Sequence, residues 1–190
     1  MTIAAEPKVM AAPMSPSWHP LTLSGSVASR ETGETVTVQA NECAFPGWRD
    51  VGVVQTGRAG AWDASADVLT TTTFRARWKS SYSQDITVQA RPGVEIEQLT
   101  RRRWSVGLFA VRSFLDRPGQ LQRFDVRARR WRTVKTFRLT EKVRRGAVGV
   151  WTYAHFRAGV RPGSRVRAYI PRTSVGPCYL AGYSIILRAR

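Results

Sequence analysis

Apolar and polar residues alternate along most ordered segments of this chain, and this period of two limits the possible folds most strongly. The clearest examples are residues 35–40, 74–78, 86–90 and 165–170, which are rich in β-branched and aromatic residues. Successive side chains of a β-strand point to opposite faces, so the pattern predicts half-buried strands. No stretch of helical length has a period of 3.6. The sequence therefore predicts an all-β protein.

Turn-forming residues separate the predicted strands. Pro-Gly pairs occur at 46–47, 92–93, 118–119 and 162–163. Proline presets the backbone angle of a turn and glycine tolerates positive φ, so these pairs mark chain reversals. Short strands at this spacing are typical of antiparallel β-sandwiches.

The chain also contains an internal repeat of five landmarks in the same order. The matches are Gly33 and residues 35–40 with Gly119 and residues 120–124, Trp48-Arg49-Asp50-Val51 with Trp131-Arg132-Thr133-Val134, Trp62 with Trp151, Phe74-Arg75-Ala76 with Val166-Arg167-Ala168, and residues 86–90 with 185–189. We therefore expect two similar sandwiches, residues 20–93 and 94–190, meeting at the turn Arg91-Pro92-Gly93. Trp48 and Trp131 are expected at equivalent buried positions.

Four motifs carry a resemblance to a known family. They are Leu23-Ser24-Gly25-Ser26-Val27, residues 72–78, Trp131-Arg132-Thr133-Val134 and residues 179–184. With them, residues 20–190 resemble the tandem immunoglobulin-like β-sandwich repeats of surface and secreted proteins from GC-rich Gram-positive bacteria, and similar modules of phage virion proteins. The resemblance implies a non-catalytic display or attachment module and names no ligand.

Residues 1–19 are predicted to form an extended arm. The segment is rich in alanine and proline, has Lys8 as its single basic residue and has no apolar stretch typical of a secretory signal. Trp18 is its one large apolar side chain, so we expect Trp18 to anchor the arm against the first sandwich or a neighbouring chain.

Two cysteines, Cys43 and Cys178, are too few for a disulfide-built scaffold or a zinc site. They are either two separate thiols or one long-range disulfide, which would favour an oxidising compartment. No apolar run is long enough to span a membrane.

Catalytic and metal-binding patterns are weak. The two histidines, His19 and His155, lie near no nucleophile signature, so we expect neither an enzyme nor a cofactor. Asp63 and Asp67 are spaced like the start of a calcium loop, but Val68 and Phe74 stand where its glycine and glutamate belong. We therefore expect no metal site.

Net charge divides the chain in two. Residues 1–93 carry eight Lys or Arg and eight Asp or Glu, whereas residues 94–190 carry 22 and five, which accounts for the whole net charge of +17. Like charges repel in a compact domain, so an anionic partner is the functional interpretation. A GC-rich genome would explain the preference for Arg over Lys but not the neutral first half.

Three basic clusters are candidates for an anion-binding or partner-binding site. They comprise Arg101, Arg102, Arg103 and Trp104; Arg127, Arg129, Arg130 and Arg132; and Lys142, Arg144 and Arg145. Guanidinium groups pair bidentately with carboxylate, sulfate and phosphate. Because Trp131 has a counterpart in Trp48, it is interpreted as a core anchor. Trp104 has no counterpart and is the better candidate for an exposed aromatic.

Three functions are consistent with these features. The first is a non-enzymatic structural or attachment module of a phage virion, such as a capsid decoration or tail protein, docking through the arm or the basic repeat. The second is an exported adhesion module of a bacterial cell surface. The third is a nucleic-acid-binding protein. The expected partners are protein neighbours in an assembly or an acidic glycan, with nucleic acid the less favoured choice.

Overall fold

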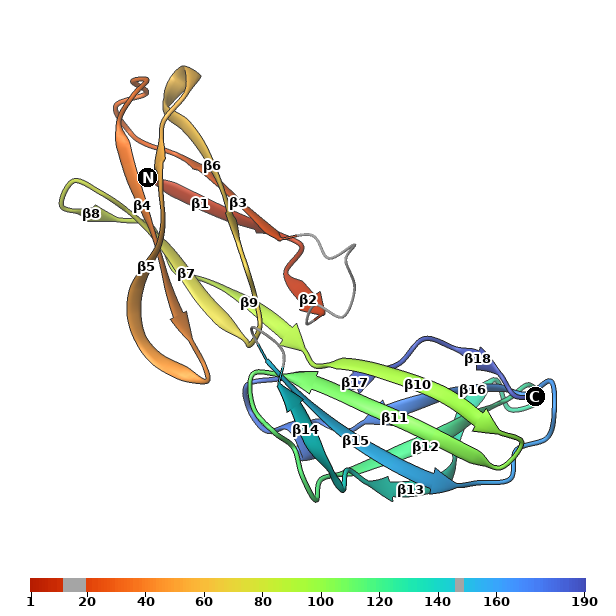
Figure 1. Ribbon diagram of the computed structural model, residues 1–190. Coiled ribbons are helices and arrows are strands. Elements are labelled where there is room, and N and C mark those ends of the chain that lie inside the picture. The colour runs from red at the N-terminus through yellow and green to blue at the C-terminus, as the bar shows by residue number, and fades with distance from the viewer. Residues whose placement is uncertain (12–19, 146–148) are drawn as a thin grey trace. The chain divides into compact units, whose positions relative to one another are not determined.

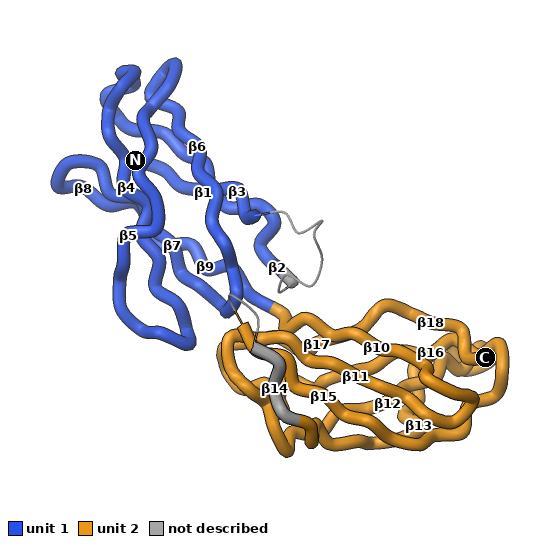
Figure 2. The backbone as a smooth tube through the Cα atoms, viewed as in Figure 1, with its two compact units in different colours: residues 1–11, 15–90 blue, residues 12–14, 91–190 orange. Residues whose placement is uncertain are grey.

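The computed structural model describes residues 1–11, 20–145 and 149–190, which form an all-β fold (Figure 1). The described residues fall into two compact units (Figure 2). Unit 1 contains residues 1–11 and 20–90, and unit 2 contains residues 91–190 without 146–148. Within these residues, helical turns are limited to η1 (Arg58–Gly60) and α1 (Arg172–Val175). No helix among these residues is long and apolar enough to cross a membrane.

Unit 1 has two sheets. The smaller has the order β1-β3-β6, with β1 (Thr2–Glu6), β3 (Leu21–Ser26) and β6 (Ala61–Ala66). The larger has the order β2-β9-β7-β4-β5, with β2 (Val9–Ala11), β9 (Ile86–Arg91), β7 (Thr72–Trp78), β4 (Thr35–Glu42) and β5 (Phe45–Gln55). The short β8 (Ser81–Tyr82) also pairs with β7.

Unit 2 also has two sheets. One has the order β10-β11-β15-β14, with β10 (Gly93–Thr100), β11 (Arg103–Ala110), β15 (Val150–Arg157) and β14 (Glu141–Arg145). The other has the order β13-β12-β16-β17, with β13 (Arg130–Arg138), β12 (Pro118–Asp125), β16 (Arg165–Ile170) and β17 (Gly182–Tyr183). The short β18 (Leu187–Arg188) also pairs with β16.

Alternation along the strands builds the core of each unit. Val36 and Val38 of β4 and Phe74 of β7 are fully or almost fully buried in unit 1. The neighbouring residues Thr37 and Arg75 are only half-buried. Leu121 of β12 and Val166 of β16 take the same role in unit 2. The period of two therefore correctly predicted strands with one buried face.

Trp104 belongs to the core of unit 2, and its predicted exposure is wrong. Its side chain is 0% exposed and its Nε1–H donates a 3.1 Å hydrogen bond to the Ala158 carbonyl. The cause is its phase on β11, where Trp104, Val106 and Leu108 all point to the buried face. Trp104 follows three arginines in the sequence, and this basic neighbourhood suggests exposure, in contrast to the alternation.

Part of the predicted N-terminal arm consists of strands of unit 1. β1 pairs with β3 from Thr2 to Glu6, and β2 lies next to β9, where the Gln89 amide donates to the Lys8 carbonyl at 3.0 Å. Ala5 and Met10 are buried. These small apolar residues thus pack as parts of sheets. The predicted anchor Trp18 lies outside the described residues.

Candidate anion-binding end of unit 2

Arginines gather at one end of unit 2 because three strand connections and the last strand meet there. The β10–β11 turn is at this end, and the register pairs Arg103 at the start of β11 with Arg157 at the end of β15. β12 runs antiparallel to β16, so the β12–β13 turn lies at the end where β16 starts. β18 pairs its Arg188 with Arg165 of β16.

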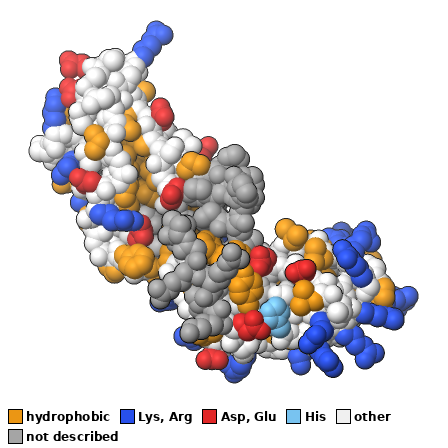
Figure 3. Space-filling model, in the orientation of Figure 1, with side chains coloured by type: hydrophobic (Ala, Val, Ile, Leu, Met, Phe, Trp, Pro, Cys, Tyr) orange, Lys and Arg blue, Asp and Glu red, His pale blue; other side chains and the backbone are white. Residues whose placement is uncertain are grey.

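We call this region the basic end and define it by eleven arginines: Arg101, Arg102, Arg103, Arg127, Arg129, Arg130, Arg157, Arg161, Arg165, Arg188 and Arg190. All eleven are exposed. Figure 3 shows Lys and Arg side chains concentrated at the same end of unit 2. Within the described residues, none of the eleven forms an ion pair with a carboxylate. Their charges are therefore available to a ligand.

Backbone contacts hold the connections of the basic end together. The Ala158 amide donates to the Arg102 carbonyl at 2.9 Å, and the Ala189 amide donates to the Ser164 carbonyl at 2.9 Å. Gln98 joins the two sheets, because its Nε2 donates to the carbonyls of Arg101 and Arg190, both at 3.3 Å. The arginines thus project from linked turns.

The β12–β13 turn has its own local cause. The Asp125 carboxylate accepts a hydrogen bond from the Ala128 amide at 3.0 Å and pairs with Arg132 Nε at 2.8 Å. The Ala128 hydrogen bond, supported by the charge of Arg132, lowers the pKa of Asp125. Arg129 has φ of 48°, in the left-handed region that favours glycine. Arginine therefore occupies a conformation that costs it backbone energy.

The structure separates the predicted binding residues into three groups. Six arginines of the first two clusters (residues 101–103, 127, 129 and 130) belong to the basic end. Arg132 pairs with Asp125, and Trp104 is buried. Lys142, Arg144 and Arg145 lie on β14, where Arg145 pairs with Val150 at the opposite end of β15.

Five arginines of the basic end were missed by the sequence analysis. They are Arg157, Arg161, Arg165, Arg188 and Arg190, each separate from the clusters in sequence. A signal was present, since residues 142–190 contain no Asp or Glu. Finding the site required knowing which connections share an end of the unit.

A second arrangement, an arginine that packs on both a tryptophan and a tyrosine ring, is found in each unit. The Arg75 guanidinium carbon lies 3.9 Å from the Trp48 ring centroid and 4.3 Å from that of Tyr82. The Arg167 guanidinium lies 4.2 Å from Trp131 and 4.5 Å from Tyr183.

A glutamine completes each of these clusters. Arg75 Nε donates to Gln39 at 2.8 Å, and Arg167 Nε donates to Gln122 at 3.0 Å. Trp48 and Trp131 do have matching surroundings, but both are half-buried beneath an arginine. Their interpretation as core anchors is wrong, because these residues face away from the core.

Two of the sequence landmarks pair residues that do not correspond. Trp62 is buried, whereas Trp151 is half-buried and stacks on Tyr153 with ring centroids 5.7 Å apart. β7 pairs Phe74 with Ile86, while β16 pairs Val166 with Leu187. The register therefore matches Ile86 with Leu187 rather than with Ile185, a shift of two residues.

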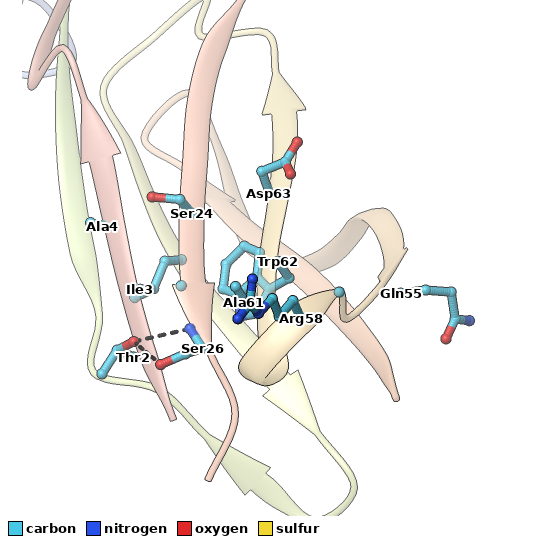
Figure 4. A pocket seen from close by; sticks show the side chains of 12 residues that line it. Thr2, Ile3, Ala4, Ser24, Ser26, Gln55, Arg58, Ala61, Trp62 and Asp63 are labelled. Atoms are coloured by element: carbon cyan, nitrogen blue, oxygen red, sulfur yellow. Dashed lines mark hydrogen bonds between the residues drawn. The ribbon is translucent and has the colours of Figure 1, made fainter. Parts of the chain in front are cut away.

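Other candidate sites contain fewer charged or reactive side chains. A hollow in unit 1 is lined by Thr2, Ser26, Arg58, Trp62 and Asp63, among others (Figure 4). The Thr2 and Ser26 hydroxyls bond to each other at 3.1 Å. Trp62 Nε1 is buried and has no hydrogen-bond partner among the described residues.

The remaining titratable side chains do not assemble into a larger site. Asp63 and Asp67 are exposed, and no group of three metal-ligating side chains occurs within residues 1–11, 20–145 and 149–190. His155 Nε2 lies 3.1 Å from Glu141. Cys43 and Cys178 are both disulfide-bonded.

Comparison of the chain with known protein families and with curated proteins finds no match. The basic end is thus characterised by its own geometry and charge.

Proposed function

We propose that this chain is a non-enzymatic attachment module and that the basic end docks it on an anionic partner. The observation that carries the proposal is the convergence of eleven exposed arginines on linked turns of one unit. None of the eleven forms an ion pair with a carboxylate in the described residues. The planar guanidinium group binds phosphate, sulfate or carboxylate through two parallel hydrogen bonds, so an arginine loses less side-chain entropy per hydrogen bond than a lysine does.

We further propose that the two units are tandem immunoglobulin-like repeats. Their sheets correspond, with β1-β3-β6 matching β10-β11-β15 and β9-β7-β4-β5 matching β18-β16-β12-β13. This division is that of the A-B-E and C′-C-F-G sheets of immunoglobulin-like sandwiches. A register shift occurs between Val38 and Gln39 of β4 and between Leu121 and Gln122 of β12. The arginine clusters of Arg75 and Arg167 support the same correspondence.

The setting that we favour is a surface assembly, with a phage virion ahead of a bacterial cell surface. Repeated sandwiches with a charged end suit attachment, because a rigid β scaffold holds the contact groups without any need for a catalytic cavity. The partner is then an acidic protein neighbour or an acidic glycan. Binding to a nucleic acid is the alternative that the experiment below distinguishes.

The test reverses charge at the basic end of the full chain. The variant R101E/R102E/R127E/R129E is compared with R112E/R117E/K135E/R172E, which changes the same number of exposed basic residues elsewhere in unit 2. Binding to immobilised heparin and to duplex DNA is measured between 50 and 200 mM salt. Counterion release predicts a loss of roughly a thousandfold over this range for wild type if six or more contacts form on a duplex.

We expect the first variant to lose binding and the second to retain most of it, with both thermal midpoints near the wild-type value because exposed charges contribute little to folding. Equal losses in both variants would show that total charge, and not the basic end, governs binding. Strong preference for duplex DNA over heparin at equal salt would favour the nucleic-acid function.

A further inference from the structure

One edge of unit 2 is open to a further strand. β17 and β18 both pair with β16, and no described strand pairs with either of them on the other side. Between them lie Ser184, Ile185 and Ile186. Backbone groups on such an edge are free to pair with another chain. We call residues 182–188 the open edge.

The open edge differs from the matching edge of unit 1 most strongly at the two residues that follow a shared serine. Ser83 and Ser184 make the same bonds, since each hydroxyl accepts from a backbone amide, Ala76 or Ala168, and donates to the following carbonyl, Gln84 or Ile185. The two residues after the serine are exposed Gln84 and Asp85 in unit 1. In unit 2 they are Ile185 and Ile186, which are 69% and 48% exposed.

Unit 1 shows how this chain covers the corresponding side of its sheet. There, β2 lies along β9 and the Gln89 amide donates to the Lys8 carbonyl at 3.0 Å. A short strand with a buried apolar residue, Met10, thus pairs along the end of this edge, while Gln84 and Asp85 remain exposed. The comparison predicts that a strand is a suitable cover for the open edge too.

Positively charged side chains around the open edge favour a negatively charged partner. Arg188 lies at one end beside Arg165, and at the other end the Arg91 guanidinium lies 5.6 Å from the Tyr183 ring centroid. None of these three arginines forms an ion pair with a carboxylate within the described part of the chain. A second copy of this edge would bring like charges together, whereas carboxylates would be attracted.

We infer that the open edge binds an extended segment of a partner protein in which apolar side chains alternate with carboxylates. Backbone hydrogen bonds to β17 and β18 would align the segment, the apolar side chains would cover Ile185 and Ile186, and the carboxylates would pair with Arg188 and Arg165. This site shares Arg165 and Arg188 with the basic end but differs from it in requiring the backbone edge of β17 and β18 and the exposed side chains of Ile185 and Ile186.

The experiment uses the full chain and an eight-residue peptide of alternating Val and Glu as the probe. Calorimetric titration gives its affinity for wild type and for I185Q/I186D, which installs the residues of unit 1. The matched control is V51D/V53Q, which makes the same kinds of change at the exposed edge strand β5. We expect at least a tenfold loss of affinity for I185Q/I186D and less than a twofold change for the control.

Three further results decide the inference. Hydrogen exchange should show protection of amides 185–188 by the peptide and none at 84–87, and a Val-Lys peptide should bind at least tenfold more weakly. Heparin binding should be unchanged in I185Q/I186Q, which adds no charge beside Arg188, whereas Val-Glu binding of the same variant should fall; this separates the open edge from the basic end. Absence of Val-Glu binding to wild type, or full binding to I185Q/I186D, would overturn the inference. Sedimentation that shows wild-type dimers lost in I185Q/I186D would also overturn it, by identifying a second copy as the occupant.

Discussion

Arg75 and Arg167 make the same contacts in the two units, although only the second unit is strongly basic. Each guanidinium packs on a Trp and a Tyr ring and donates from Nε to a Gln. Because the neutral unit has the cluster too, its role is structural rather than ligand-binding.

Replacing either arginine should therefore destabilise its unit. R75A and R167A are expected to lower the free energy of unfolding by about 1–3 kcal/mol, through loss of a partly desolvated cation–π contact and a hydrogen bond. R75K and R167K should recover only part, since lysine has no Nε donor fork. Urea denaturation followed by circular dichroism measures the effect. A change below about 0.5 kcal/mol, as expected for exposed R101A, would contradict the structural role.

Ser184 should be more important than its size suggests. Its hydroxyl accepts from the Ala168 amide at 2.8 Å and donates to the Ile185 carbonyl at 2.7 Å. S184A leaves a buried amide without a partner and should cost about 1–3 kcal/mol, with a similar cost for S83A. S29A, at an exposed serine, serves as the control in the same denaturation assay. A stable S184A would mean that a water replaces the hydroxyl.

Gly25 is expected to tolerate no side chain. A Cβ there would lie 2.1 Å from the Thr2 carbonyl oxygen and 2.6 Å from the Trp62 ring, so G25A must displace β1 or the indole. We expect a loss of about 1–3 kcal/mol or more, together with faster amide exchange in residues 2–6. G52A is the control, because nothing lies within 4 Å of its added methyl. Equal stability of the two variants would show that β1 is not an integral part of unit 1.

Arg129 is predicted to lower the folding stability of unit 2 slightly while contributing to anion binding. Its φ of 48° favours glycine, so R129G should leave stability unchanged or raise it by about 1 kcal/mol. The same change should weaken heparin binding, because it removes one charge of the basic end. Thermal melting and heparin elution, measured on the same samples, test both parts. Loss of stability would indicate contacts of the Arg129 side chain that outweigh its backbone strain.

Asp125 should make the stability of unit 2 depend on acid pH. Its pKa is lowered in the folded state, so its contribution is present above the ordinary aspartate pKa of about 3.9 and is lost as pH falls through the lower folded value. D125N retains an acceptor for the Ala128 amide but loses the charge. The difference in unfolding free energy between wild type and D125N should therefore be positive at pH 7 and vanish in strong acid. A difference that persists there would assign it to packing.

Alternation predicted the strands well because it follows directly from strand geometry, as in residues 35–40 and 165–170. The same alternation would have predicted the burial of Trp104, which lies in phase with the apolar residues Val106 and Leu108. The neighbouring arginines led instead to the prediction of an exposed side chain. Half-burial of Trp48 and Trp131 was not predictable from the repeat, because a matched position says nothing about which face it occupies.

The basic end was predictable only in part. Arg101–Arg103 and the cluster at 127–130 are local in sequence, so composition finds them. Arg157, Arg161 and Arg188 join them only because antiparallel pairing returns distant turns to the same end. The N-terminal strands were missed for a related reason, since small residues such as Ala5 become core residues only when β3 and β9 are placed beside them.

The hydrogen bond between Trp104 and the Ala158 carbonyl gives the protein a built-in optical reporter. The indole is fully buried, and Ala158 is the residue whose amide bonds to Arg102 in the β10–β11 turn. A ligand that pulls these connections apart must expose the indole to water and shift its fluorescence emission to longer wavelength. The difference between wild-type and W104F spectra would isolate this signal from the other six tryptophans. Any separation of these two connections can thus be followed in real time without attaching a label.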